Sequence, residues 1–201
     1  MLDAQTHGTL IDAAPIEGAF SRLFVIIAAV AFGVCLLTLS AKLQVPFWPV
    51  PMTMQTLVVL MLGMAYGPRL GAGTVLAYLL VGAAGLPVFA GTPERGIGLA
   101  YMMGPTGGFL MGFVLAAWIT GALAERGWDR SVPWCAAAML AGTVVIFVLG
   151  LAALIPITGL SRAIETGLVP FLASSALKIA LGAVAMPVIW RVLGRRHAMR
   201  P

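Results

Sequence analysis

Charged and polar side chains are scarce in this sequence of 201 residues, of which 9% are charged and 61% are hydrophobic. Asparagine is absent and glutamine occurs only at Gln5, Gln44 and Gln55. Such a composition excludes an ordinary soluble domain and predicts an integral membrane protein. The acidic side chains all fall in tails or connections rather than in apolar segments: Asp3, Asp12, Glu17, Glu94, Glu125, Asp129 and Glu165.

The motifs of several enzyme classes are also missing. Neither lysine, Lys42 or Lys178, lies in the Gly-Lys-Ser/Thr sequence of a phosphate-binding loop, so ATP-driven work requires another subunit. His7 and His197 lie in opposite tails without His-Glu-x-x-His spacing, which disfavours a zinc site. Paired intramembrane carboxylates and a Gly-x-Ser-x-Gly elbow are absent as well. We therefore expect no metal, no other cofactor and no enzyme.

Six apolar runs predict an all-α protein with six transmembrane helices at residues 23–41, 53–66, 70–85, 106–124, 132–155 and 169–193. The second and third runs are shorter than the ~20 residues that cross a typical bilayer, so they either extend into their flanks or form a re-entrant pair. The helical unit is expected at 22–194. A polar tail at 1–21, without the basic start of a signal peptide, precedes it, and a basic tail at 195–201 follows.

Basic residues predict the orientation. The 12 lysines and arginines are spread along the chain beside the apolar segments, which favours topology over nucleic-acid binding as their explanation. With an even number of crossings, eight of them fall on the side of both termini, three on the other side, and Lys178 within a segment. The positive-inside rule therefore predicts cytoplasmic termini in a multi-pass protein of the cytoplasmic (inner) membrane.

Lys178 is the only acidic or basic side chain in the interior of an apolar segment, because Arg191 lies close to the end of the last one. A lysine near the middle of a membrane helix costs roughly 2.5–3.5 kcal/mol on insertion scales, so it usually faces a cavity and has a partner. Its own segment offers no partner, which favours an anionic ligand. The alternatives are pairing with Glu94 or Glu165, a neutral amine, or extension to the interface.

Three polar residues can accompany this lysine. Ser174 and Ser175 lie one helical turn before Lys178; they form either a Ser-Lys pair or, as is commoner near a helix start, local caps and packing groups. Gln55 follows a proline-rich outer stretch, and a buried amide must find a partner in protein, water or ligand. These side chains are candidate ligand contacts.

Two further features leave alternatives open. Phe47 and Trp48, between the prolines of residues 45–56, either close over an apolar ligand or anchor the chain at the membrane interface. Ala29 and Gly33 form a small-xxx-small pattern in the first apolar segment, which allows close approach of either a helix of this chain or a partner membrane subunit.

Four stretches together resemble the BioY family, the biotin-specific substrate-binding (S) components of energy-coupling-factor transporters. They are Val-Pro-Met-Thr-Met-Gln-Thr (50–56), Gly-Leu-Pro-Val-Phe-Ala-Gly (85–91), Gly-Pro-Thr-Gly-Gly-Phe-Leu-Met-Gly-Phe (104–113), and Pro-Phe-Leu (170–172) followed by Leu-Lys-Ile-Ala-Leu (177–181). The likeness covers nearly all of the chain after the N-terminal tail, with the stretches in the family's order.

The resemblance implies a six-helix protein that captures biotin from outside and works in the bilayer with a transmembrane coupling subunit and a pair of ATPases. In that scheme the small-residue face of the first helix contacts the coupling subunit. Lys178 would hold the biotin valerate. The ring would lie on aromatic side chains and the ureido group on polar ones, which we assign as Phe47, Trp48, Phe89 and Tyr101 for the ring and Gln55, Ser174 or Ser175 for the ureido group.

The sequence departs from the family pattern at two places. Relatives often carry an Asp where this chain has Ser175, and often an Asn after the third segment, whereas this chain has none. Ureido recognition is therefore expected to differ in detail. The rival hypotheses are an S component for another carboxylate-bearing vitamin, a Ser/Lys intramembrane hydrolase, and an assembly subunit without a ligand.

Overall fold

The computed structural model describes residues 19–45, 50, 52–94 and 96–198. Helices dominate this part of the chain, as predicted. Their order, with a short strand pair after the first helix, is α1 (Ala19–Lys42), β1 (Gln44–Val45), β2 (Met52–Thr53), α2 (Gln55–Ala83), α3 (Gly98–Met102), α4 (Gly107–Ala124), η1 (Trp128–Arg130), α5 (Val132–Thr158), α6 (Leu160–Gly167) and α7 (Val169–Ala198).

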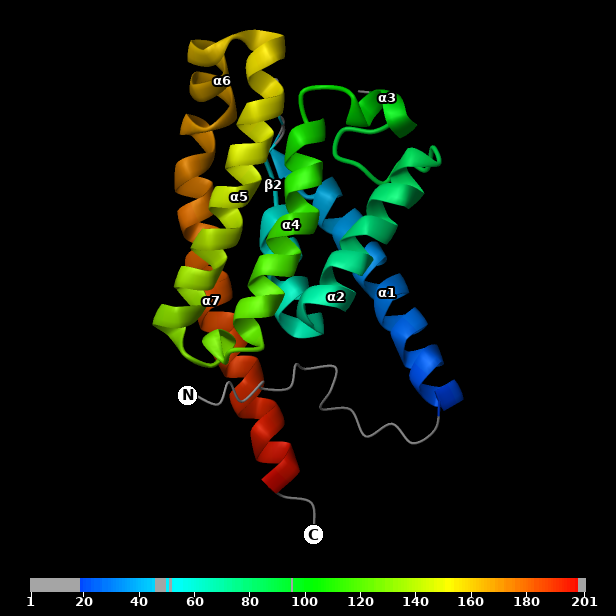
Figure 1. Ribbon diagram of the computed structural model, residues 1–201, viewed down its shortest axis with the longest axis vertical. Helices are drawn as coiled ribbons and strands as arrows, with labels where there is room; N and C mark the ends of the chain where they lie inside the picture. The colour runs from blue at the N-terminus through cyan, green and yellow to red at the C-terminus, as the bar shows by residue number, and fades with distance from the viewer. Residues whose placement is uncertain (1–18, 46–49, 51, 95, 199–201) are drawn as a thin grey trace, which may run out of the picture.

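Among the described residues, five helices are long and apolar enough to cross a membrane, because the second and third predicted segments are joined in α2. The joint is sharp. At Gly67 the backbone leaves helical geometry (φ 79°, ψ 174°), and Pro68 follows. Figure 1 shows the two arms of α2 meeting at a low point and diverging upward. A positive φ favours glycine and proline cannot donate a helical hydrogen bond, so the two residues together explain the break.

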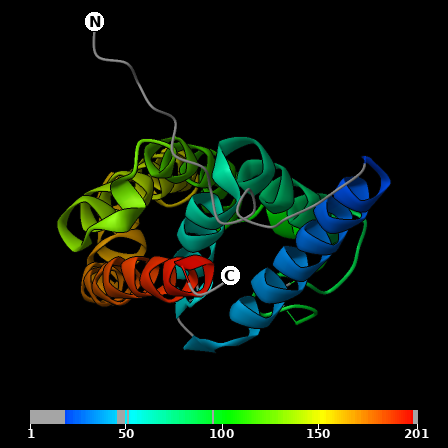
Figure 2. The ribbon, with the colours of Figure 1, turned by 90° about the horizontal axis from the view of Figure 1, so that it is seen from below.

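The helix ends agree with an even number of passes. In Figure 1 the first residues of α1 and the last described turn of α7 lie at the same end of the molecule. Figure 2 shows α1 at one edge beside α2, with α5 and α7 on the opposite side. Large apolar side chains are exposed on the long helices, among them Phe32, Leu80, Leu115, Val148 and Leu181. Apolar outer faces of this extent are typical of helices that contact lipid.

Glycines allow α2 and α4 to approach closely. A Cβ added at Gly121 would lie 2.4 Å from the backbone nitrogen of Pro68, and one at Gly63 would lie 2.4 Å from the carbonyl oxygen of Ala117. Small residues permit such backbone contact between membrane helices, where packing rather than the hydrophobic effect drives association. The first arm of α2 is thereby fixed against α4.

Lys42, the last residue of α1, holds the connection between α2 and α3. Its Nζ donates to the carbonyl oxygens of Phe89 and Thr92, each at 3.1 Å, and to Thr92 Oγ1 at 3.0 Å. Phe89 is itself fully buried. Hydrogen bonds from a charged donor are about twice as strong as neutral ones, so this contact fastens the connection to α1.

We expect Lys42→Met to release this connection, because the methionine keeps the length of the side chain but donates no hydrogen bond. The free energy of unfolding should fall by about 1–2 kcal/mol, and amide hydrogen exchange should accelerate in residues 84–97. Lys42→Arg, which keeps the donor, is the matched control. Unchanged exchange in Lys42→Met would contradict this role.

Candidate functional site

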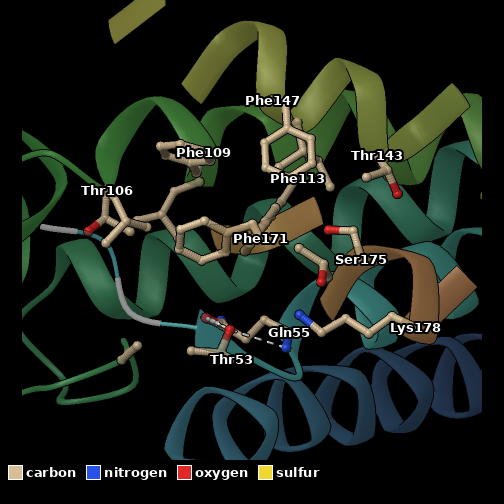
Figure 3. A pocket seen from close by; sticks show the side chains of 15 residues that line it. Thr53, Gln55, Thr106, Phe109, Phe113, Thr143, Phe147, Phe171, Ser175 and Lys178 are labelled. Carbon is tan, nitrogen blue, oxygen red and sulfur yellow. Dashed lines mark hydrogen bonds between the residues drawn. The ribbon is translucent and has the colours of Figure 1, made fainter. Parts of the chain in front are cut away.

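A cavity lies between β2, the start of α2, and helices α4, α5 and α7. Its empty volume is about 560 Å³, including the part open to solvent. Four phenylalanines from three helices form much of its apolar wall: Phe109, Phe113, Phe147 and Phe171. Figure 3 shows their rings gathered on one side and the polar side chains of Gln55 and Lys178 on the other. A mostly apolar cavity with a few placed polar groups is typical of a small-molecule site.

Lys178 lines this cavity, and its side chain is 6% exposed. Within the described part of the chain it makes no hydrogen bond and no ion pair. The acids that sequence analysis offered as partners are elsewhere: Glu94 is exposed, and Glu165 is exposed and accepts a hydrogen bond from Ser161. In Figure 3 Lys178 extends from α7 toward the wall that holds Gln55 and Thr53. The cavity therefore contains a buried cation, and no carboxylate of the described residues lies beside it. Such a site favours an anionic ligand.

Ser175 and Ser174 differ in position. Ser175 is buried and lines the cavity one turn before Lys178, whereas Ser174 is half-buried and does not line it. Among the described residues no hydrogen bond joins Ser175 to Lys178. An activated serine nucleophile requires such a contact, so the geometry gives the Ser-Lys pair no support.

Gln55 lines the cavity at the first turn of α2 and is 3% exposed. Its Nε2 donates to the hydroxyl oxygen of Tyr78 at 2.8 Å. Thr53 Oγ1 donates to Gln55 Oε1 at 3.4 Å and accepts from the Gln55 backbone N–H at 3.3 Å. The buried amide thus has protein partners on both sides, and it remains part of the cavity wall.

Thr56 was missed by sequence reasoning. It lines the cavity next to Gln55, and its buried Oγ1 has no hydrogen-bond partner in the described part of the chain. A buried unpaired hydroxyl costs free energy until something bonds to it, so Thr56 is a ready contact for a polar ligand atom. The signal available was its position directly after Gln55 at the start of the helix.

The aromatic assignments stay predictions. Phe89 and Tyr101 stack on each other, with ring centroids 5.0 Å apart and planes 15° apart, but neither lines the cavity. Ala90, which follows Phe89 in the sequence, does line it, so this part of the chain reaches the cavity through Ala90. Phe47 and Trp48 lie outside the described residues.

Three of the four lining phenylalanines, all but Phe147, lie in the stretches that carried the family resemblance. Phe109 and Phe113 are four residues apart, hence on one face of α4, and Phe171 lies in the Pro-Phe-Leu stretch. Helical spacing alone does not tell a ligand-facing ring from a core ring, which is why they were not singled out.

The small-residue face of α1 lies against α2. A Cβ at Gly33 would lie 2.4 Å from the Thr74 Cγ2, and Tyr66 donates from its hydroxyl to the carbonyl oxygen of Ala29 at 3.0 Å. This is the intramolecular packing that the pattern allowed. Contact of Ala29 and Gly33 with a partner subunit stays a prediction.

The fold and the cavity define a helical membrane protein with a buried small-molecule site. Among the described residues that line this site, Lys178 is the one cation, and it has no ion-pair partner there. The model of the BioY family matches residues 17–195, and the chain belongs to that family.

Relatives agree with this assignment, and one solved structure has a similar fold. The probable biotin transporter BioY of Pyrococcus horikoshii is 34% identical over 158 residues, 79% of this chain and 91% of that protein. The biotin transporter BioY of Thermotoga maritima is 37% identical over 74% of this chain and 86% of its own length. The crystal structure of the S component for biotin from an ECF-type ABC transporter matches 87% of this chain and 95% of that chain, with a TM-score of 0.72 and 21% identity.

Proposed function

We propose that this protein binds biotin in the α2/α4/α5/α7 cavity and serves in biotin uptake as the S component of an energy-coupling-factor transporter. The observation that carries the proposal is Lys178, a buried cation without a described carboxylate partner, in the cavity of a BioY family member. Biotin supplies the missing anion through its carboxylate. The names of the relatives support biotin as the ligand.

Each part of biotin has a matching surface. Its carboxylate would accept a charge-assisted hydrogen bond from Lys178 Nζ. Its apolar ring system would lie against Phe109, Phe113 and Phe171. Its ureido group, with two N–H donors and one acceptor, would contact polar groups of the wall near Thr56 and Gln55. We assign no direct ring contact to Phe89 or Tyr101, because neither reaches the cavity.

Transport requires more than this chain. The sequence holds no phosphate-binding loop, so we propose that a transmembrane coupling subunit and ATPase subunits supply the energy. We also propose a location in the cytoplasmic membrane with both termini inside, which the excess of basic residues on the terminal side supports. Because Ser175 makes no bond to Lys178, we propose a binding role rather than an enzymatic one.

The proposal is tested by binding of radiolabelled biotin to the detergent-purified protein, with a panel of unlabelled competitors. Biotin should compete, and biotin amide should compete poorly because it lacks the carboxylate. A well-folded protein that does not bind biotin would refute the assignment. A second candidate is another carboxylate-bearing vitamin, which Lys178 would hold equally well. Competition by lipoate or pantothenate at concentrations where biotin fails would favour it.

A further inference from the structure

A chain of hydrogen bonds behind the cavity wall fixes the positions of the nitrogen Nε2 and the oxygen Oε1 of the Gln55 amide. It begins at Val88, in the outer connection after α2, whose carbonyl oxygen can only accept. Tyr78, on the second arm of α2, lies 3.0 Å away through its hydroxyl and therefore donates its single proton to Val88. Tyr78 is 0% exposed, so no solvent molecule competes for that proton.

The direction of this bond decides the next one. With its proton committed to Val88, the Tyr78 oxygen can only accept from Gln55, 2.8 Å away. The donor must be the amide nitrogen Nε2, and the amide oxygen Oε1 must take the other position, beside Thr53. Gln55 and Thr53 both line the cavity. Thr53 donates to one lone pair of Oε1, which leaves the second lone pair as an acceptor for a ligand in the cavity that both residues line.

We propose that Tyr78, which does not line the cavity, is a positioning residue that determines ligand specificity. By holding Gln55 with Oε1 available to the cavity, Tyr78 favours ligands that offer an N–H donor to Gln55. It disfavours ligands that offer an acceptor there. A carbonyl or ether oxygen placed there would face Oε1 without a hydrogen between them. This inference rests on the proposed function, in which the ligand is biotin and its ureido group provides the N–H.

The test compares biotin with its cyclic carbonate analogue, in which oxygen atoms replace both ureido N–H groups. Dissociation constants of both ligands are measured on the purified full-length protein. The wild type should prefer biotin about 30-fold, because the analogue offers no hydrogen to Gln55 Oε1 and places an oxygen atom against it instead. In Tyr78→Phe the amide is free to rotate and present Nε2, so this ratio should fall at least about fivefold.

The chain offers a matched control in Tyr66→Phe. Tyr66 also lies on α2 and also donates its hydroxyl proton to a backbone carbonyl, that of Ala29, but it does not line the cavity or contact Gln55. Its loss should leave the ratio unchanged. A Tyr78 that merely supports the fold would weaken both ligands equally and leave the ratio at its wild-type value, which would overturn the inference.

A second variant tests whether Tyr78 acts through Gln55. Gln55→Met should lower the ratio by itself, and Tyr78→Phe should then change it no further. If Tyr78→Phe does not fold, Gln55→Met alone decides: an unchanged ratio overturns the inference. Biotin binding with an unchanged ratio in all variants would overturn the role of Tyr78 and leave the proposed function intact. Failure of the wild type to bind biotin would overturn both.

Discussion

Lys178→Met should weaken biotin binding by about 10- to 100-fold and at the same time make the unliganded protein more stable. The affinity falls because a charge-assisted hydrogen bond, worth about 1.5–3 kcal/mol, is lost, and each 1.4 kcal/mol is a factor of ten. The stability rises because Lys178 is buried without an ion-pair partner in the described part of the chain. Replacing such a cation with an apolar side chain of similar length should add about 1–3 kcal/mol to the free energy of unfolding.

Opposite changes in affinity and stability identify a group kept for its ligand rather than for the fold. Calorimetric titration gives the affinity, and thermal unfolding without ligand gives the stability. Biotin amide is the matched ligand: its affinity should be low for the wild type and change little in Lys178→Met. Lys178→Arg, which keeps the charge, should retain part of the affinity. A Lys178→Met protein that binds biotin as tightly as the wild type would remove Lys178 from the site.

Gly121→Ala should strongly destabilise the protein, because the added methyl group has no room. An ideal Cβ at Gly121 would lie 2.4 Å from the Pro68 nitrogen and 2.5 Å from the Gly67 carbonyl carbon, and both are backbone atoms at the kink of α2. Backbone cannot rotate away as a side chain can, so the two helices must separate. Overpacking typically costs 1–3 kcal/mol, and we expect at least about 3 kcal/mol here.

Gly73→Ala is the matched control on the second arm of α2. A Cβ at Gly73 would meet nothing within 4 Å, and alanine favours a helix over glycine by about 1 kcal/mol. This variant should therefore unfold at the same or a higher temperature than the wild type, while Gly121→Ala unfolds at a lower one. Equal unfolding temperatures for the two variants would show that the α2–α4 contact is looser than the structure indicates.

Much of the fold follows from the sequence because a membrane helix requires a long run of apolar residues, which is visible in the sequence. Long apolar runs with few charges predicted the helical segments, and the pair of short segments around Gly67 and Pro68 was visible as a break in hydrophobicity. What the runs could not give is that the two short segments are arms of one kinked helix. The kink itself lies at Gly67 and Pro68, but it also packs tightly against Gly121, a contact between residues far apart in the chain.

The site was predictable where a polar residue stands among apolar ones. Lys178 and Gln55 are conspicuous because charged and amide side chains are rare in this chain, and both line the cavity. Phe89 has no such distinction, and its sequence neighbour Ala90 lines the cavity in its place. Thr56 was overlooked because threonines are common here and only the fold shows which hydroxyl is buried without a partner.

The most direct test of the account is a structure of the biotin complex. We expect biotin in the α2/α4/α5/α7 cavity, with a carboxylate oxygen within hydrogen-bond distance of Lys178 Nζ and the ring system against Phe109 and Phe113. We also expect the ureido group at the wall of Gln55 and Thr56. Biotin bound in the reverse direction, with its carboxylate away from Lys178, or bound outside this cavity, would contradict it.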